Sequence, residues 1–291
     1  MPLLVPRAID AHTKLIALIG DPVEHSKSPV LQNAALEQLG LNVVNVALRV
    51  RVADLSAFVV GAKAAGFLGL MVTIPHKAAA LLLADERDPL ADLLGAANLL
   101  HFRGDGATVA YNTDVGGAEQ ALRDHGLSVR GTRFLVLGAG GAAHGLVLHF
   151  LHEGGQVALA NRTRARAETL ADEAVAKLGV RPQVIDWSNE SLATAAAEAE
   201  VVINTTAVGM RPNLDESPLP VAALRPGMTV FDLVYNPLET RLLREARAAG
   251  AAALDGVGML VYTNQRAVQI CCGESPDVAL MRAVCVESLQ A

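Results

Sequence analysis

Short apolar runs alternate with longer stretches of helical periodicity along most of the chain. In the first part, apolar runs at 14–20, 42–50 and 69–74 are separated by helical stretches at 28–40 and 53–66. Parallel strands need a crossover of about helix length, so this alternation predicts βαβ units and parallel sheets. The pattern therefore predicts an α/β fold.

Two local signals refine the first part. Ser28 can cap the helix at 28–40, Pro29 suits its first turn, and Gly40 can end it. The stretch 98–112 alternates around Gly104-Asp105-Gly106, which predicts a hairpin.

A second series of elements begins near residue 117. Five strands are expected, in the segments "RFLVLGAGG", "QVALANR", "PQVIDW", "EVVINTTA" and "TVFDLVY", and three helices, in "AAHGLVLHFLHEGG", "RARAETLADEAVAKLG" and "LETRLLREARAAG". The final stretch, 258–291, is helical in pattern, and we expect it to pack on the first domain. The chain should therefore form two α/β domains, 1–116 completed by 258–291 and 117–257, with a cleft between them.

Composition excludes several classes of protein. Of 291 residues, 52% are hydrophobic and 19% charged, which indicates a folded chain long enough for two domains. No apolar run is long enough to span a bilayer, and "MPLLVPRAID" lacks the pattern of a signal peptide. The net charge of −6, with scattered basic residues, disfavours nucleic acid as a partner. The cysteines (Cys271, Cys272, Cys285) form no CxxC pair, which favours a reducing compartment, the cytoplasm.

A glycine-rich turn follows the first strand of the second series. The turn is Gly138-Ala139-Gly140-Gly141-Ala142-Ala143, a G-x-G-x-x-A match between an apolar strand and a helix. Glycines there allow a tight turn and let backbone N–H groups approach a pyrophosphate at the helix N-terminus. The alternative is a strand-to-helix turn without a ligand. We expect a Rossmann-type dinucleotide site.

The end of the next strand indicates which dinucleotide binds. An enzyme specific for NAD places an acidic residue here, whereas this chain has Asn161, Arg162 and Thr163, with Arg164 and Arg166 following. A guanidinium binds a 2′-phosphate that a carboxylate would repel. NADP is therefore the expected cofactor, unless these arginines are a solvated helix start.

Polar residues also gather at strand ends in the first domain. Two hydroxyls at the start of a helix suit a small anion such as a carboxylate, although Ser28 could be a simple N-cap. Lys77 follows the third strand, where it could serve chemistry or sit in water. The residues expected at one edge of the sheet are Ser26, Ser28, Lys77, Asn98, Asn112 and Asp114.

With these motifs in order, the sequence resembles the shikimate dehydrogenases, a family that includes quinate dehydrogenases and related paralogues. The matching stretches are "GDPVEHSKSP", "VTIPHK", "GAAN", "NTDVGG", "VLGAGGAA", "NRT", "NTTAVGM", "DLVYNP" and "GMLVY". The resemblance implies NADP-dependent, reversible oxidation of a ring hydroxyl in shikimate or a related cyclic polyol carboxylate. It also implies an N-terminal substrate domain, with Ser26 and Ser28 holding the carboxylate.

The resemblance also assigns the remaining site residues. Lys77 and Asp114 would form the catalytic pair, with a neutral lysine as base although its usual pKa is about 10.4. Asp114 could orient the lysine and share its proton. Further substrate contacts are implied at Thr73, Asn98, Met71 and Thr263. Cofactor contacts are implied at Gly138, Gly140, Gly141, Ala142, Asn161, Arg162, Thr163, Arg166, Thr205, Gly209, Met210, Val234 and Gly256.

Three substrate-side positions depart from the family pattern. Met71 stands where the family usually has Asn, Leu99 where it has Thr, and Thr263 where Gln is common, although Gln265 lies two residues on. A thioether is a poor hydrogen-bond partner. The face that recognises the substrate hydroxyls is therefore expected to be altered.

Other residues indicate no further chemistry. His144, His149 and His152 lie on one predicted helix, but no constellation of carboxylates accompanies them, so we expect no metal site. Cys271 and Cys272 are expected to be buried packing residues, and His76 is not assigned a role. We expect a monomer or homodimer. The second functional hypothesis is a ligand-binding or redox-sensing module with little turnover, which would have no need of Lys77 and Asp114.

Overall fold

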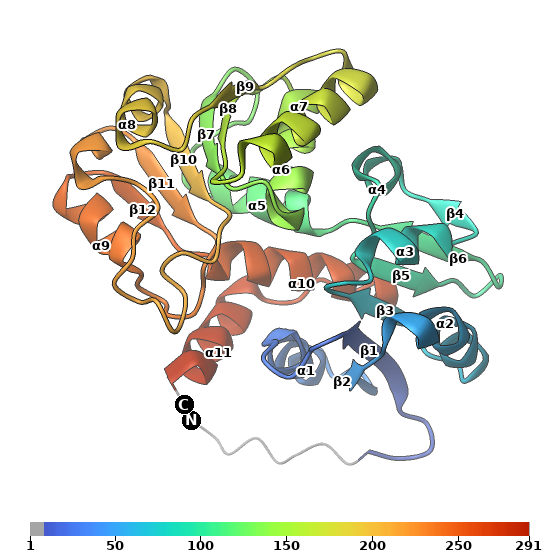
Figure 1. The fold of residues 1–291 in the computed structure, drawn as a ribbon. Helices are drawn as coiled ribbons and strands as arrows, with labels where there is room; N and C mark the ends of the chain where they lie inside the picture. Colours follow the sequence, from blue (N-terminus) through green and yellow to red (C-terminus); the bar gives the residue numbers. More distant parts are fainter. Residues whose placement is uncertain (1–8, 291) are drawn as a thin grey trace. The chain divides into compact units, whose positions relative to one another are not determined.

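The computed structural model describes residues 9–290, so the signal-peptide expectation for the first residues lies outside the described part. The chain divides into two compact units (Figure 1). Unit 1 contains the residues up to Thr113 and those from Val261 onward, and unit 2 is Asp114–Leu260. The C-terminal helices α10 (Val257–Cys272) and α11 (Val278–Gln290) therefore belong largely to unit 1.

Unit 1 contains a mixed sheet in the order β2-β1-β3-β5-β6-β4. Its strands are β1 (Lys14–Gly20), β2 (Val43–Arg49), β3 (Gly69–Val72), β4 (Glu86–Arg87), β5 (Leu99–Phe102) and β6 (Thr108–Tyr111). The predicted hairpin is confirmed as β5 and β6, which pair antiparallel. β5 also pairs antiparallel with β3, so the sheet is mixed, while β2, β1 and β3 pair parallel as expected for βαβ units.

The two faces of this sheet are covered by different helices. Ala17, Ile19 and Leu70 point to the face covered by α2 (Leu55–Ala64), α3 (Lys77–Leu82) and α4 (Pro89–Leu94). Ile16, Leu18 and Met71 point to the other face, where Ala267 and Cys271 of α10 pack. Residues alternate between faces because side chains on a strand alternate in direction. A 3-10 turn, η1 (Val52–Asp54), precedes α2.

The ends of α1 (Ser28–Gln38) differ in part from expectation. Lys27 is the N-cap residue and makes no side-chain cap bond, so the predicted capping role of Ser28 is wrong. Pro29 lies in the first turn as expected. Gly40 has φ +68°, the left-handed conformation that follows many helices.

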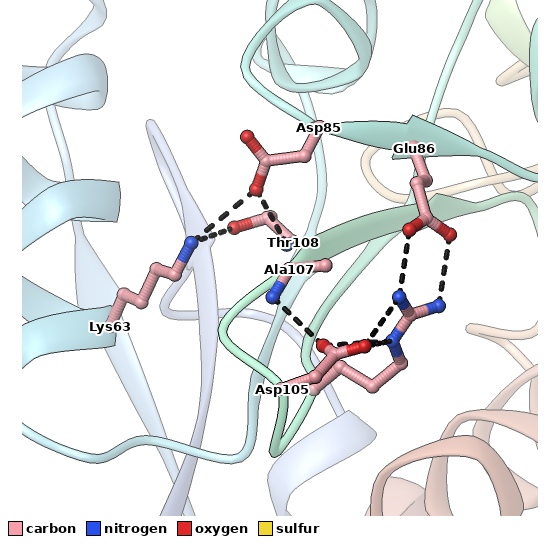
Figure 2. Close-up of polar contacts among 7 residues, drawn as sticks. Lys63, Asp85, Glu86, Asp105, Ala107 and Thr108 are labelled. Atoms are coloured by element: carbon pink, nitrogen blue, oxygen red, sulfur yellow. Dashed lines mark hydrogen bonds and ion pairs between the residues drawn. The ribbon is translucent and has the colours of Figure 1, made fainter.

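Polar contacts join the turn between β5 and β6 to neighbouring elements of unit 1. Figure 2 shows Lys63 of α2 donating to the Thr108 hydroxyl (3.0 Å) and contacting Asp85, which accepts from the Thr108 N–H. Arg103 in the turn pairs with Glu86 of β4 and with Asp105. These groups are largely exposed, so they add little to stability but fix the turn locally.

Unit 2 contains a parallel sheet in the order β12-β11-β10-β7-β8-β9 (Figure 1). Its strands are β7 (Arg133–Leu137), β8 (Gln156–Ala160), β9 (Gln183–Ile185), β10 (Val201–Asn204), β11 (Thr229–Asp232) and β12 (Ala252–Leu254). Its helices are α5 (Asp114–Arg123), α6 (Gly141–His152), α7 (Arg164–Leu178), α8 (Asn189–Glu198) and α9 (Arg241–Ala248), with the 3-10 turn η2 (Val221–Ala223). A buried cluster joins α8 and α9 to one face of the sheet. The predicted strands and helices are present, and α5, α8 and β12 were not predicted.

Candidate active site

The glycine-rich turn between β7 and α6 is closed on one side and open on the other. Gly138 has φ +113°, and a Cβ there would lie 2.5 Å from the Thr205 hydroxyl, so a larger residue does not fit. A Cβ on Gly140 or Gly141 would meet nothing within 4 Å, and Ala142 is exposed. Open space therefore lies against free N–H groups at the start of α6, which fits a phosphate of a dinucleotide.

The side chain of Asn161 forms hydrogen bonds to the glycine-rich turn and to the start of α7. Its Oδ1 accepts from the Ala139 N–H (3.1 Å), and its Nδ2 donates to the Thr163 carbonyl (2.8 Å). Thr163 is the N-cap residue of α7 but makes no side-chain cap bond. The Asn161 amide thus joins the glycine turn to the start of α7.

The arginines after β8 differ in their partners. Arg164 is paired with Glu168 and Asp186. Within residues 9–290, the guanidinium groups of Arg162 and Arg166 are exposed and have no hydrogen-bond or ion-pair partner. They are therefore available to an anionic ligand such as a 2′-phosphate, whereas Arg164 is already engaged.

A pocket of about 320 Å³ lies beside Arg162, within unit 2. It is lined by Arg162 after β8, Trp187 after β9 and Val208 after β10, so it opens at the carboxyl ends of three parallel strands. This is the edge where open α/β sheets bind ligands. Trp187, the chain's single tryptophan, was not singled out from the sequence, although its place directly after the "QVI" strand was a usable signal.

A buried network supports the loops after β10 and β11. Asn204 donates through Nδ2 to Asp232 (2.9 Å) and to the Val208 carbonyl (3.2 Å), and Thr240 donates to the other Asp232 oxygen (2.6 Å). Burial raises the pKa of Asp232 to about 6, while these hydrogen bonds act in the opposite direction. The sequence analysis missed Asn204 and Asp232, which are the last residues of two buried strands.

The remaining predicted cofactor residues border this network. Thr205 donates its hydroxyl to the Leu137 carbonyl (2.7 Å). Gly209 has φ +89°, Met210 is 45% exposed, and the Val234 N–H donates to the buried carboxylate (3.0 Å). A Cβ on Gly256 would lie 2.4 Å from the carbonyl oxygen after β11, so close backbone approach requires glycine there.

In unit 1, the two predicted serines lie at the start of α1. The Ser26 hydroxyl accepts from the Ser28 N–H (3.3 Å). Ser28 is nearly buried, and no group within residues 9–290 bonds its hydroxyl. A free hydroxyl beside the first N–H groups of a helix suits a carboxylate.

Lys77 is the first residue of α3 and is half-buried. Thr73, four residues earlier, accepts through its carbonyl from the His76 N–H (2.9 Å). The ring of His76 is 1% exposed and donates through Nε2 to the Val50 carbonyl (2.7 Å), which gives it a structural role. The Ala97 N–H donates to the Lys77 carbonyl (2.9 Å) and so joins the start of α3 to the segment before β5.

Asn98 and Thr263 both bond Thr113. Asn98 and Thr263 are 3% and 5% exposed, so these two predicted substrate residues have their polar groups largely committed within unit 1. Asn112 donates to the Ala96 carbonyl (3.0 Å). Asp114 is the first residue of α5.

Met71 lies in a buried cluster of amide side chains. Gln32 Nε2 is 2.6 Å from the Met71 sulfur and donates to Asn264 Oδ1 (3.0 Å), while Asn45 Nδ2 donates to Gln32 Oε1 (2.5 Å). Asn45 Oδ1 is buried without a partner among the described residues. The thioether thus contacts the protein's own amides in this structure.

Two of the three histidines of α6 pair with carboxylates. His144 contacts Glu173 (2.9 Å) and His149 contacts Glu119 (2.7 Å). Within the described residues, no group of three or more His, Cys, Asp or Glu side chains could hold a metal ion. Burial raises the pKa of the Cys271 thiol, and that of Cys272 to about 11, so neither is a reactive thiolate at neutral pH.

No helix in the described part of the chain is long and apolar enough to cross a membrane.

A model of the shikimate dehydrogenase substrate binding domain matches residues 18–100, and a shikimate / quinate 5-dehydrogenase model matches residues 119–219. The shikimate dehydrogenase (NADP(+)) of Methanopyrus kandleri is 43% identical over 97% of this chain and 98% of its own.

Two solved structures agree with these matches. A shikimate dehydrogenase in complex with NADP⁺ has a TM-score of 0.90 and 39% identity, covering 97% of this chain and 98% of its own. Shikimate 5-dehydrogenase of Listeria monocytogenes, in complex with shikimate and NAD, has a TM-score of 0.90 and 32% identity over 96% of this chain and 99% of its own. The fold and the glycine turn define a two-unit α/β protein with a dinucleotide-binding unit. Within that class, the chain belongs to the shikimate dehydrogenase family.

Proposed function

We propose that this chain is an NADP-dependent dehydrogenase that reversibly oxidises a ring hydroxyl of shikimate, giving 3-dehydroshikimate and NADPH. The main structural support is the glycine turn, closed by Thr205 and open at Gly140 and Gly141. After the next strand lies the guanidinium of Arg162, which has no partner among the residues that the structure describes. Relatives of nearly the same length are named shikimate dehydrogenase (NADP(+)). Bound NADP would supply the hydride acceptor.

The cofactor is assigned to the carboxyl edge of the unit 2 sheet. Backbone N–H groups at Gly140 and Gly141 would hold the pyrophosphate, and Arg162 and Arg166 the 2′-phosphate. Trp187 and Val208 would form walls for the adenosine part, because both line the pocket beside Arg162. The loops containing Thr205, Gly209, Met210, Val234 and Gly256 would border the rest of the cofactor.

The substrate groups are assigned to unit 1. Ser26 and Ser28 would bind the carboxylate. Lys77 would take the proton of the ring hydroxyl while the carbon that bears this hydroxyl loses hydride to NADP. Asp114 would orient Lys77 and share its proton. Thr73, Asn98, Met71 and Thr263 remain proposed contributors to the substrate site, although Asn98 and Thr263 bond Thr113 and Met71 contacts Gln32.

A cytoplasmic location and a monomeric or homodimeric state are also proposed. The first rests on the cysteines, which are free in the described part of the chain.

The direct test is spectrophotometric. Purified protein is incubated with NADP or NAD and a panel of cyclic polyol acids, and absorbance of the reduced cofactor is followed. We expect turnover with NADP, and a requirement for the carboxylate so that methyl shikimate is not oxidised. Tight NADPH binding, seen as quenching of Trp187 fluorescence, without turnover of any acid would instead support the binding-module hypothesis.

A further inference from the structure

A reciprocal pair of hydrogen bonds joins the points at which the chain leaves unit 1 and re-enters it. The chain leaves after Thr113 and returns at Val261. The Thr113 hydroxyl donates to the Thr263 carbonyl (3.2 Å), and the Thr263 hydroxyl donates to the Thr113 carbonyl (3.4 Å). Both threonines are about 95% buried, so water does not compete well for these groups.

Asn98 completes the set of contacts to Thr113. Its Oδ1 accepts from the Thr113 N–H (2.7 Å), and its Nδ2 donates to the Thr113 hydroxyl oxygen (2.9 Å). The N–H, carbonyl and hydroxyl of Thr113 are thus all bonded to Asn98 and Thr263. A buried polar network with every member satisfied holds its residues in a single arrangement.

The residue after Thr113 is Asp114, the first residue of α5. Consecutive Cα atoms are fixed about 3.8 Å apart, so the contacts that orient Thr113 also orient the backbone of Asp114. A misplacement of about 1 Å in a reacting group can lower a rate about 10²-fold. We propose that Thr113 and Thr263 are positioning residues that fix Asp114 for the chemical step, an inference that rests on the proposed function.

This role differs from the substrate contact first assigned to Thr263. A substrate contact that is equally strong in ground and transition states changes KM, whereas misplacement of a reacting group changes kcat. The two roles therefore give different kinetic signatures for the same substitution.

The test compares isosteric and conservative variants at both positions. Thr113→Val and Thr263→Val remove a hydroxyl at constant shape, whereas Thr113→Ser and Thr263→Ser keep the hydroxyl and remove only the methyl group. Thr108→Val is the matched control, because Thr108 is also buried in unit 1 and its hydroxyl bonds Lys63 (Figure 2). Steady-state kinetics with shikimate, NADPH affinity and the pH profile of kcat are measured for each.

We expect the valine variants to lower kcat by about 10- to 100-fold, with KM and NADPH affinity changed less than about threefold, well under the tenfold that 1.4 kcal/mol represents. The pH profile of kcat should also differ from that of the wild type, because Asp114 would be displaced from the reacting groups. The serine variants should recover most of the rate, and Thr108→Val should keep wild-type kcat. A raised KM at constant kcat, or an equal loss in Thr108→Val, would overturn the proposal.

Hydrogen exchange of the segment 111–117 gives a readout that does not depend on activity. Exchange should be faster in both valine variants and unchanged in the serine variants. If the wild-type protein showed no turnover, the proposed function would fail, and exchange would still decide whether these threonines hold the start of α5. Unchanged exchange in both valine variants would overturn the positioning role even in an active enzyme.

Discussion

Met71 on β3 lies directly opposite Leu99 on β5, and both side chains are buried. Two of the three departures from the family pattern are therefore one cross-strand pair. Directly opposed residues of an antiparallel pair contact each other, so their substitutions are expected to be coupled. Where the family pattern has an amide and a hydroxyl, this chain has a thioether and an isobutyl group on the α10 face of the sheet.

The first prediction restores both members of this pair. The double variant Met71→Asn with Leu99→Thr should raise kcat/KM for shikimate about tenfold or more, equivalent to about 1.4 kcal/mol. Met71→Asn alone should give less of this gain than the double variant, because the new amide would still face the apolar side chain of Leu99 across the strand pair. Kinetics and urea unfolding of the wild type, both single variants and the double variant would measure the coupling.

Two results would count against this prediction. One is strictly additive behaviour of the two substitutions, which would show that the pair does not act together. The other is a wild-type protein that already oxidises shikimate at about 10⁵–10⁶ M⁻¹s⁻¹, an ordinary enzyme efficiency. In that case Met71 is a tolerated neighbour and does not limit substrate choice.

The second prediction concerns the proposed base. Lys77→Met keeps the length of the side chain but removes its amine, and kcat should fall about 10²–10⁴-fold with NADP affinity nearly unchanged. Lys63→Met is the control, since Lys63 lies in the same unit and contacts Asp85 and Thr108. Asp114→Asn should also be severely impaired. A Lys77→Met variant with most of the wild-type kcat would show that Lys77 is not the base.

The third prediction concerns cofactor choice. Arg162→Gln should lower the preference for NADP over NAD by about 10- to 100-fold, because a hydrogen bond to a charged group contributes about 1.5–3 kcal/mol. Arg164→Gln should leave the preference within about twofold, less than 0.5 kcal/mol, since Arg164 is already paired with Glu168 and Asp186. The measurement is kcat/KM for both cofactors in each variant. If the two substitutions lowered the preference for NADP equally, Arg162 would have no special role in binding the 2′-phosphate.

Local sequence signals predicted the parts of the fold that depend on neighbouring residues. The strand, glycine turn and helix from Arg133 to His152 were predicted because tight turns and helix starts need particular residue types in sequence. Helix α8 was missed because "NESLATAAAE" is alanine-rich and shows little periodic contrast. It forms because Leu192, Ala195 and Ala196 pack into the buried cluster of unit 2.

Long-range pairing was not predictable in the same way. The register that sets Met71 against Leu99 depends on β5 pairing antiparallel to β3, which no local pattern specifies. Likewise, the bond between Thr113 and Thr263 joins residues 150 positions apart. The resemblance indicated that Thr263 was unusual, but its hydrogen-bond partner became known only from the fold.

The last prediction follows from the buried carboxyl of Asp232. Burial raises its pKa from 3.8 to about 6, so the folded chain binds this proton more tightly than the unfolded chain. The stabilising contribution of the protonated form is complete below about pH 3.8 and is lost as pH rises through about 6. At 1.36 kcal/mol per unit, the loss is about 3 kcal/mol.

Asp232→Asn removes this titration while keeping a neutral side chain of the same shape. Its Oδ1 can still accept from Asn204 and the Val234 N–H, and its Nδ2 can donate to the Thr240 hydroxyl. Between about pH 4 and pH 7, the free energy of unfolding of the wild type should therefore fall relative to that of the variant, as measured by urea unfolding. Asp105→Asn is the control of opposite sign, because the hydrogen bond from Arg103 lowers the pKa of Asp105 to about 2. The free energy of unfolding of the wild type should therefore rise relative to that of Asp105→Asn as pH rises from about 2 to 4. A constant difference between wild type and Asp232→Asn across this range would mean that Asp232 titrates alike in the folded and unfolded chains.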